Sequence, residues 1–500
     1  MHRRALLAAI VVSSALTSLP TTALVLALPA IHHDFHASVS ELQWTLTSYS
    51  LAYSSLLVVG GRLGDLLGRV RFFEVGVVIW VGAAALGAAA SNATVLIVAM
   101  GLLGLGSAAL TPASLALLTS EWTGPQRTQA ISAWALASSV VSGAGPTIGG
   151  VITAEASWRW IFGVVAVVAA ATLALTVLAH DVDSRADNAA HPQPFHALLL
   201  VVGLTSVSLA LIQGPQWELD SAPTLTIFAF GVLVLAWFLR TEVRDAVPLL
   251  ELELLRVRTF VAGVIVKLGV NFALAAFLFF ISLYLQEVLG YTAEQAGWGL
   301  LPLTAPFVAF APVGSRLGAR FGMRLPILLG VSISIVAFVL VTRLDSDLRY
   351  IDLLPSILLL GIGAGLVVTP MNAAPLNAIP QRQHGEAAAI LQMTTGLGAV
   401  LGIALGGALF QEMHERRLTD FLGRKALSES TQRDLSGVLV HSPPAERALH
   451  QFDDATAATI VRGIREAYVF GVSTTMWLAA GVLAAGLVAT LALMRPTTAS

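Results

Sequence analysis

The chain has 500 residues, of which 56% are hydrophobic and 12% charged, and its formal net charge is −2. Soluble domains carry about 25% charged residues, so this composition indicates an integral membrane protein. The chain has no cysteine, which excludes disulfides, thiolate metal sites and cysteine nucleophiles. Its near-neutral charge gives no general attraction to nucleic acid.

Apolar runs long enough to cross about 30 Å of hydrocarbon need about 20 residues each when helical. We predict fourteen such spans, and the first, which follows MHRR, is longer than the apolar core of a signal peptide and is interpreted as retained. In chain order the spans begin near Ala5, Gln43, Phe72, Thr94, Gln129, Trp158, Phe195, Pro223, Thr259, Ala293, Leu325, Asp352, Gly385 and Ala467.

Arginines cluster after the even-numbered spans, whereas the loops after spans one, three, seven and nine have neither Lys nor Arg. Basic loops stay in the cytoplasm, so we expect a multi-pass protein of the cell membrane with both termini cytoplasmic. The longest hydrophilic segment, 411–466, is then an external loop. Its basic residues carry little weight, because long loops cross largely regardless of charge.

The sequence also contains an internal repeat. GRLGDLLGR at 61–69 returns as SRLGARFGM at 315–323, and GLGSAALTP at 104–112 is echoed by GIGAGLVVTP at 361–370. Parallel repeats are typical of transporters whose two halves move about a central site. We therefore expect an all-α membrane protein with a six-helix bundle in 1–180, two inserted helices in 181–258, and a second six-helix bundle in 259–500.

The first copy of the repeat predicts a conformational clamp. Its glycines allow close helix packing, while Asp65 can accept hydrogen bonds from a helix N-terminus and from Arg69. A basic turn that only sets topology is the alternative. The residues assigned to the clamp are Gly61, Arg62, Gly64, Asp65, Gly68, Arg69 and Arg71.

These motifs resemble those of a known family. GRLGDLLGRVRFF, from residue 61, is similar to the cytoplasmic signature of the major facilitator superfamily, and GAGPTIGG at 143–150 to the fifth-helix signature of its exporters. QWTLTSYSLA, SWRWIF, PLLELELLR and YLQEVLGYT resemble its fourteen-helix drug and proton antiporter branch. The resemblance covers nearly all of the chain. It implies the major facilitator fold and multidrug efflux, the export of diverse hydrophobic compounds, antibiotics among them, in exchange for protons.

The exporter motif contributes Gly145, Pro146, Gly149 and Gly150. Proline bends a helix, and glycines at helical spacing let a neighbouring helix approach. We expect this segment to seal and reopen during transport. A purely structural kink is the alternative.

The first helix departs from the family pattern. Thr21, Thr22 and the Ala-Leu-Pro at 27–29 match, but Pro20 stands where the family has Asp, and Met100 stands at its fourth-helix Arg position. The charged residues typical of the branch are therefore missing, and proton coupling would need other groups. We expect Thr21 and Thr22 to line a substrate cavity, and a plain core helix is the alternative.

Lys267 is the charge deepest within a predicted span, and it shares a helical face with Asn271. A charge at mid-bilayer depth costs about 2.5 to 3.5 kcal/mol, so both residues are candidates for substrate binding or coupling. Snorkelling of the lysine toward water is the alternative. Trp44 and Tyr49 could stack on an aromatic substrate, or anchor the protein at the membrane interface.

Other classes of function lack their motifs. Neither lysine, Lys267 or Lys425, follows a glycine, so the phosphate loop of an ATP-driven pump is absent, and no G-x-S-x-G hydrolase motif is present. HHDFH at 32–36 is interpreted as a solvated loop, so we expect no metal there. Because the motifs above are absent, we also expect no enzyme activity, catalytic residue or cofactor.

The sequence is best interpreted as a secondary exporter of hydrophobic or amphipathic small molecules, working by proton antiport with atypical coupling residues. A facilitator or importer of an anionic metabolite is the alternative. The expected partners are the substrate, protons and lipid, and we expect a monomer that binds no nucleic acid.

Overall fold

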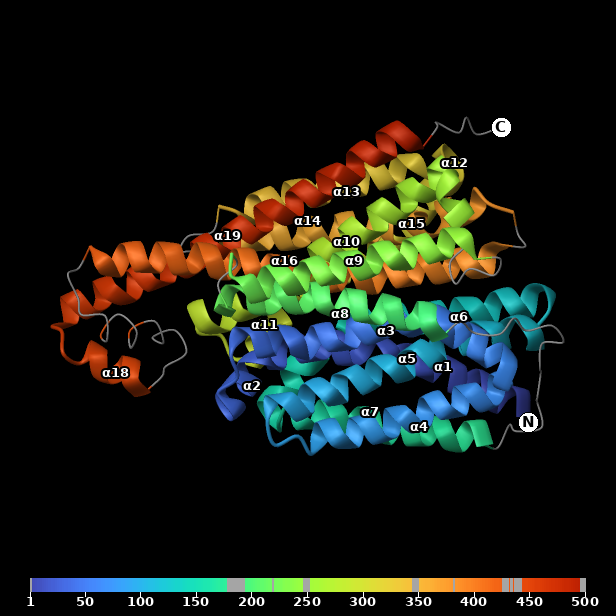
Figure 1. Cartoon of the computed structure of the whole chain (residues 1–500), viewed down its shortest axis with the longest axis horizontal. Helices are drawn as coiled ribbons and strands as arrows, with labels where there is room; N and C mark the ends of the chain where they lie inside the picture. The colour runs from blue at the N-terminus through green and yellow to red at the C-terminus, as the bar shows by residue number, and fades with distance from the viewer. Residues whose placement is uncertain are drawn as a thin grey trace.

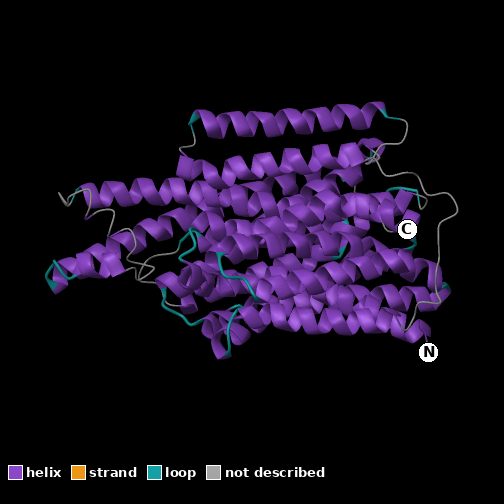
Figure 2. Ribbon diagram, turned by 60° about the horizontal axis from the view of Figure 1, so that its bottom comes forward, coloured by secondary structure: helices purple, strands orange, loops and turns teal. Residues whose placement is uncertain are grey.

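The computed structural model describes residues 2–177, 194–217, 220–245, 252–343, 350–380, 383–424, 431, 435 and 443–494. The regular elements in these ranges are all helices, which confirms the predicted all-α class (Figure 2). The start of α1 (His2–Ala23) and the end of α19 (Asp454–Leu493) lie at one end of the bundle, and α18 (Pro443–Leu449) lies at the other (Figure 1). We call these the terminal end and the distal end.

The N-terminal half is a bundle of long helices joined by short turns. α1 (His2–Ala23) continues through the 3₁₀ turn η1 (Leu24–Ala27) into α2 (Leu28–Phe35), and α3 (Val39–Leu67), α4 (Arg69–Ala88), α5 (Ala93–Glu121), α6 (Gly124–Glu155) and α7 (Arg159–Val177) follow. Local sequence fixes where two of them begin. Ser38 and Glu41 form a capping box at the start of α3, and the Asn92 side chain accepts from the Val95 N–H at the start of α5.

The C-terminal half is built in the same way. It contains α10 (Arg258–Leu283), the π-helical turn η3 (Tyr284–Val288), α11 (Ala293–Gly299), α12 (Leu301–Phe321), α13 (Arg324–Val341), α14 (Tyr350–Val368), α15 (Pro370–Asn377), α16 (His384–Gly423) and α19 (Asp454–Leu493). The predicted loop 411–466 is helical at both ends, because its hydrophilic residues are good helix formers and Asp453 caps α19.

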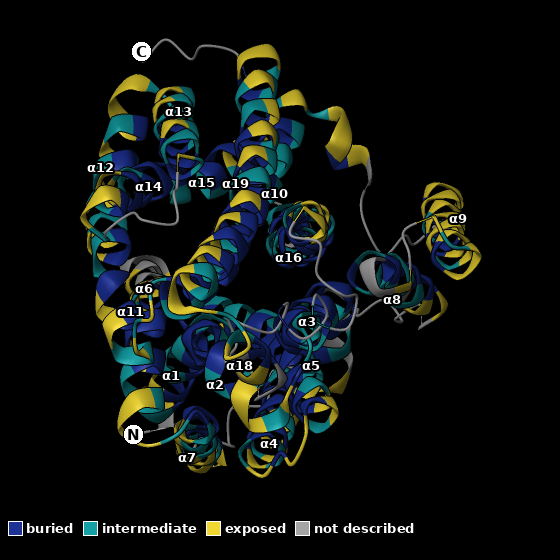
Figure 3. Ribbon diagram, turned by 90° about the vertical axis from the view of Figure 1, so that its left-hand side faces the viewer, coloured by how far each residue is buried: buried dark blue, intermediate teal, exposed yellow. Residues whose placement is uncertain are grey.

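Two more helices stand beside these halves. α8 (Pro194–Trp217) packs against α3 of one half and α16 of the other, and α9 (Ala222–Arg244) packs on α8. The short η2 (Leu252–Arg256) leads from them into α10. α9 is the outermost helix (Figure 3), and it exposes Phe230, Leu233 and Trp237. An apolar outer surface of this kind suits contact with lipid tails.

Twelve helical stretches among the described residues are long and apolar enough to cross a membrane. They include every predicted span except those of α3 and α8. α3 is rich in Ser and Thr, and α8 contains a shorter apolar stretch, Leu198–Gly214. The chain is therefore a multi-pass membrane protein, and the count of fourteen spans stays a prediction.

The two halves repeat each other in backbone detail. Gly68 joins α3 to α4 with φ of 94°, and Gly322 lies between α12 and α13 with φ of 86°. Only glycine adopts this conformation without strain. The predicted boundary at 180 lies outside the described residues, and the division into 1–180, 181–258 and 259–500 stays a prediction.

Candidate substrate cavity and its seal

A cavity of about 370 Å³ lies between the two halves. α1, α3, α5 and α6 form one side of it, and α10, α12, α14 and α16 form the other. Its wall combines aliphatic and aromatic side chains with many hydroxyls, such as those of Ser18, Ser50, Ser138 and Thr395. No charged side chain lines it within the part of the chain that the structure describes.

The structure places four of the predicted cavity residues in this wall: Thr21, Thr22, Tyr49 and Asn271. The Thr22 hydroxyl donates to the Ser18 carbonyl at 2.9 Å, and Tyr49 shares a 2.8 Å hydrogen bond with Ser107. Trp44 does not reach the cavity. The first helix therefore supplies hydroxyl oxygens that can still accept a hydrogen bond from a bound molecule.

Lys267 lies directly behind the wall and is 2% exposed. Its ammonium donates to Oδ1 of Asn372 at 2.6 Å and to Oε1 of Gln392 at 2.9 Å. Gln392 lines the cavity, as does Tyr53 of the opposite half. This differs from snorkelling, in which the ammonium would reach water. No ion pair joins Lys267 to a carboxylate of the described residues.

The two partners of this lysine were not among the residues predicted from the sequence. Asn372 and Gln392 are amides in otherwise apolar spans, and polar residues inside a membrane are functional candidates by default. That signal was present in the sequence, but it did not indicate which spans would lie next to Lys267.

The exporter motif lies where three helices meet. A Cβ atom at Gly145 would overlap the Thr22 side chain, and one at Gly149 would overlap the carbonyl of Ala23. Gly150 lies in the same way against Ala293, the first residue of α11 in the other half. Pro146 is buried between these contacts. α6 therefore packs on α1 and α11 without room for any side chain at these glycines.

The clamp residues lie at the terminal end, where α3 turns into α4. Gly64 packs under the Phe72 ring, Gly68 supplies the left-handed turn, and Arg69 begins α4, with Arg71 also in its first turn. The side chains of Arg62 and Asp65 lie outside the described residues, so the clamp stays a prediction.

Three hydrogen bonds among the described residues join the halves on the distal side of the cavity, and we call this set of contacts the seal. The Ser282 hydroxyl donates to the Val25 carbonyl at 2.7 Å, and the Gln286 amide to the Leu26 carbonyl at 3.2 Å. The Thr147 hydroxyl donates to Gly297 at 3.0 Å. Val25 and Leu26 belong to η1, where the change from α to 3₁₀ geometry exposes backbone carbonyls to outside donors.

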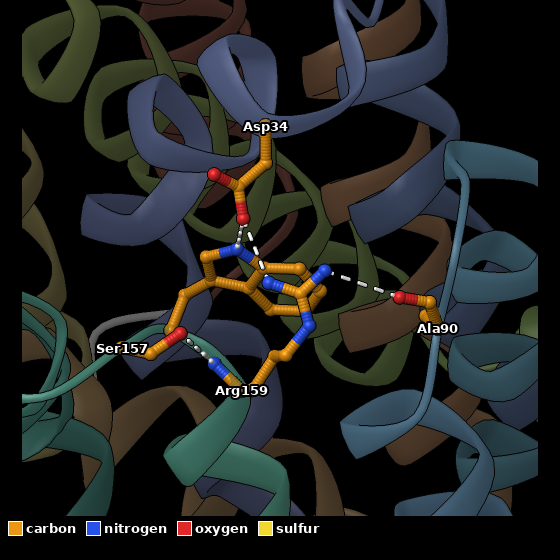
Figure 4. A network of polar contacts seen from close by, with 5 residues as sticks. Asp34, Ala90, Ser157 and Arg159 are labelled. Atoms are coloured by element: carbon orange, nitrogen blue, oxygen red, sulfur yellow. Dashed lines mark hydrogen bonds and ion pairs between the residues drawn. The ribbon is translucent and has the colours of Figure 1, made fainter.

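The HHDFH segment at 32–36 lies at the end of α2 and contacts the start of α7. Asp34 accepts from the Trp158 indole at 2.8 Å and from Arg159 at 2.7 Å, and Arg159 also donates to the Ala90 carbonyl (Figure 4). The SWRWIF motif thus ties α2 to the start of α7. Asp34 is held by these donors, which gives it a structural role.

Comparison with known proteins identifies the family. The Major Facilitator Superfamily sequence model matches residues 10–403. The chain is 30% identical to the multidrug resistance protein Stp of Mycobacterium tuberculosis over 84% of this chain and 78% of Stp. It is 29% identical to the multidrug efflux pump LfrA of Mycolicibacterium smegmatis over 96% and 94%.

The fold is similar to that of solved transporters. A bacterial homolog of the human lysosomal transporter Spinster, in an inward-facing and occupied conformation, aligns over 99% of this chain and 97% of its own. Its TM-score is 0.65 and its identity 17%, so this likeness concerns the fold.

Proposed function

This chain belongs to the major facilitator superfamily, and on that premise we propose that it is a secondary exporter of hydrophobic or amphipathic small molecules. Membership makes the chain a transporter rather than an enzyme, as the motifs indicated. Relatives that match most of its length carry names for multidrug resistance and efflux, and this supports drugs, antibiotics and dyes as the substrate class.

The observation that carries the proposal is the cavity between the halves. Its volume of about 370 Å³ falls in the range of about 300 to 1,000 Å³ that is usual for small-molecule sites. Aliphatic and aromatic surfaces bind by area and tolerate varied shapes, whereas scattered hydroxyls accept or donate single hydrogen bonds. Such a wall favours molecules with a large apolar part and few polar groups.

We further propose that export is driven by protons and that the protein acts as a monomer in the cell membrane with cytoplasmic termini. The arginines after even-numbered spans support this orientation, and the distal end then faces outward. Because Pro20 and Met100 replace the family's charged residues, the coupling group must lie elsewhere in the chain.

A second candidate is the passage of anions without proton coupling. The buried Lys267, whose ammonium donates to two amide oxygens, favours it, because a cation next to a cavity attracts anions. Everted membrane vesicles and three dyes separate these functions. The dyes are cationic ethidium, neutral phenylnaphthylamine and anionic anilinonaphthalenesulfonate.

Export by antiport predicts that a pH gradient makes the vesicles accumulate phenylnaphthylamine or ethidium, and that a protonophore abolishes the accumulation. Vesicles from cells without the protein are the control. Equilibration of the anionic dye alone, with no response to the gradient, would support the second candidate and contradict the first.

A further inference from the structure

A second cluster of polar groups lies at the distal end, beyond the seal. Its carboxyl group is that of Glu287 in η3, which is partly buried. η3 is a π-helical turn, closed by a 3.1 Å bond from the Leu289 N–H to the Tyr284 carbonyl five residues earlier. Such turns are uncommon, and they occur frequently at functional sites.

Neighbouring residues of this turn interact with different parts of the molecule. Gln286 reaches across to the Leu26 carbonyl of the N-terminal half, while Glu287 interacts electrostatically with Tyr468 of α19. Successive residues of a helix point about 100° apart, so one turn can hold the seal with one side chain and a titratable group with the next. A change at Glu287 can therefore alter the position of Gln286.

Tyr468 and the polar groups near it on α16 have unused hydrogen-bonding capacity. Tyr468 is 8% exposed, and its buried hydroxyl has no hydrogen-bond partner among the described residues. The same holds for Nδ1 of His414, whose ring lies 5.9 Å from that of Tyr468, and for Oε1 of Gln411. Unsatisfied buried polar atoms cost about 1 to 3 kcal/mol each, so several at one place point to a ligand such as water or a proton.

The helix faces that carry these groups continue into the cavity. Ile403 lines the cavity on α16, and Gly407 and Gln411 follow it one helical turn apart. Leu46 lines it on α3, and Gln43 lies one turn toward the distal end. The Gln43 amide packs against Gly407, and both of its polar atoms are buried without a partner in the described part of the chain. Unpaired polar atoms thus lead from the cluster toward the substrate.

The other titratable groups on η3, α11, α16 and α19 do not form part of the cluster around Tyr468. Within the described residues, Glu415, Arg465 and Glu466 are exposed, Glu412 pairs with Arg416, Glu294 accepts from the Trp298 indole, and Tyr284 is buried with a contact of its own. Among these groups, Glu287 is left as the carboxylate that interacts electrostatically with Tyr468.

We propose that Glu287, together with Tyr468 and His414, forms a proton-binding site at the distal end, and that its loading is coupled to the Gln286–Leu26 contact of the seal. The site takes a proton from distal water when the seal opens, and the carboxylate becomes a carboxylic acid. It returns the proton toward the cavity along the path past Gln411 and Gln43. This inference rests on the proposed exporter function and names the group that couples it to protons.

The experiment uses the full chain in proteoliposomes that contain a pH-sensitive dye and receive phenylnaphthylamine, ethidium or anilinonaphthalenesulfonate. For exchange of one proton, a gradient of one pH unit supports about tenfold accumulation. Wild type should approach this ratio and move protons with the dye. Glu287→Gln should accumulate no dye above the external concentration, while its downhill flux at equal pH stays within about twofold of wild type.

Three further variants test whether the effect of Glu287→Gln is due to the lost carboxylate and not to a structural change. Glu287→Asp should restore proton movement, which a merely structural side chain would not require. Tyr468→Phe keeps the ring contact with Phe410 and should displace the pH midpoint of accumulation. Glu415→Gln, an exposed carboxylate beside His414, is the matched control and should behave as wild type.

The outcomes distinguish the inference from the function beneath it. Gradient-driven accumulation by Glu287→Gln at the wild-type level overturns the site, as does equal loss of downhill flux in the Gln and Asp variants. A wild-type protein that equilibrates dyes without any response to pH overturns proton coupling and the site together, but leaves transport standing. A wild-type protein that moves none of the three dyes refutes the export proposal itself.

Discussion

The hydroxyl of Ser282 donates a 2.7 Å hydrogen bond to the carbonyl oxygen of Val25. Pro29 has no N–H and cannot make the α-helical bond to the carbonyl four residues before it, which is that of Val25. That oxygen is therefore open to a donor from outside its helix. Because Val25 and Ser282 belong to opposite halves, proline in the first span creates an acceptor that the second half uses to close the cavity.

Ser282→Ala should weaken this seal. Loss of one buried hydrogen bond costs about 1 kcal/mol, which shifts the balance between closed and open states about fivefold. The chain has no cysteine, so Leu278→Cys in the cavity wall gives a single labelling site. We expect a membrane-impermeant maleimide added at the distal side to react faster when Ser282→Ala is also present.

The matched control is Thr226→Ala. Its hydroxyl is exposed on α9 and bonds only within that helix, to Ala222 and Pro223, so its removal should not change the labelling rate. Equal labelling rates with and without Ser282→Ala would show that this bond contributes nothing to closure.

The Ala-Leu-Pro motif illustrates how far the sequence can be interpreted. Its match to the family was visible, and proline's missing donor is a local property. Ser282, however, lies 257 residues after Val25, and no local pattern identifies it as the partner. The helical class and the repeat were predictable because hydropathy and glycine spacing are local properties of the sequence.

The candidate site shows the same division. Thr21, Thr22, Tyr49 and Asn271 were found because hydroxyls and amides in apolar spans are conspicuous. The partners of Lys267 were missed because Asn372 and Gln392 come from two other helices, and their contact depends on how α10, α15 and α16 pack. The external position of 411–466 stays a prediction. Hydropathy did not show that α16 and α19 extend as helices into both ends of that segment.

The exporter motif predicts a graded response to added methyl groups. Gly149→Ala should reduce dye transport and thermal stability, because its Cβ would overlap the Ala23 backbone and overpacking costs about 1 to 3 kcal/mol. Gly143→Ala, two turns earlier on α6, places its Cβ 3.5 Å from Val308, an ordinary contact, and should be tolerated. Identical transport and unfolding temperature for the two variants would contradict the close packing of α6 on α1.

The clamp predicts loss of transport without loss of protein. Asp65→Asn and Arg69→Ala should each abolish dye export at near-normal membrane levels, because the clamp acts on the interconversion of states and not on insertion. Export is measured in everted vesicles with the protein amount fixed by immunoblot. Glu253→Gln, an exposed acid on η2, is the control. Normal export by both clamp variants would leave the motif with a topological role only.

We expect Lys267 to make transport depend on the charge of the substrate. The ammonium is buried and held by two amide oxygens close behind the cavity wall, so an anion in the cavity would be attracted and a cation repelled. Anilinonaphthalenesulfonate and phenylnaphthylamine share one skeleton and differ by the sulfonate. Comparing them therefore isolates the effect of charge, and ethidium supplies the opposite sign.

Lys267→Met keeps an unbranched chain and removes the charge. It should lower transport of the anionic dye about tenfold, the effect of about 1.4 kcal/mol, leave the neutral dye unchanged and raise transport of ethidium. Lys267→Arg keeps the charge, but its planar fork cannot place a compact ammonium between Asn372 and Gln392, so it should transport the anion less well than wild type.

Transport is measured in proteoliposomes between about pH 6 and 8, around physiological pH. If the Arg variant changes the pH profile, Lys267 itself exchanges a proton with the substrate. If all three proteins transport the same dyes with the same profile, the lysine has no part in binding, because a charge at this position that affects neither selectivity nor pH dependence serves only to hold α10 against α15 and α16.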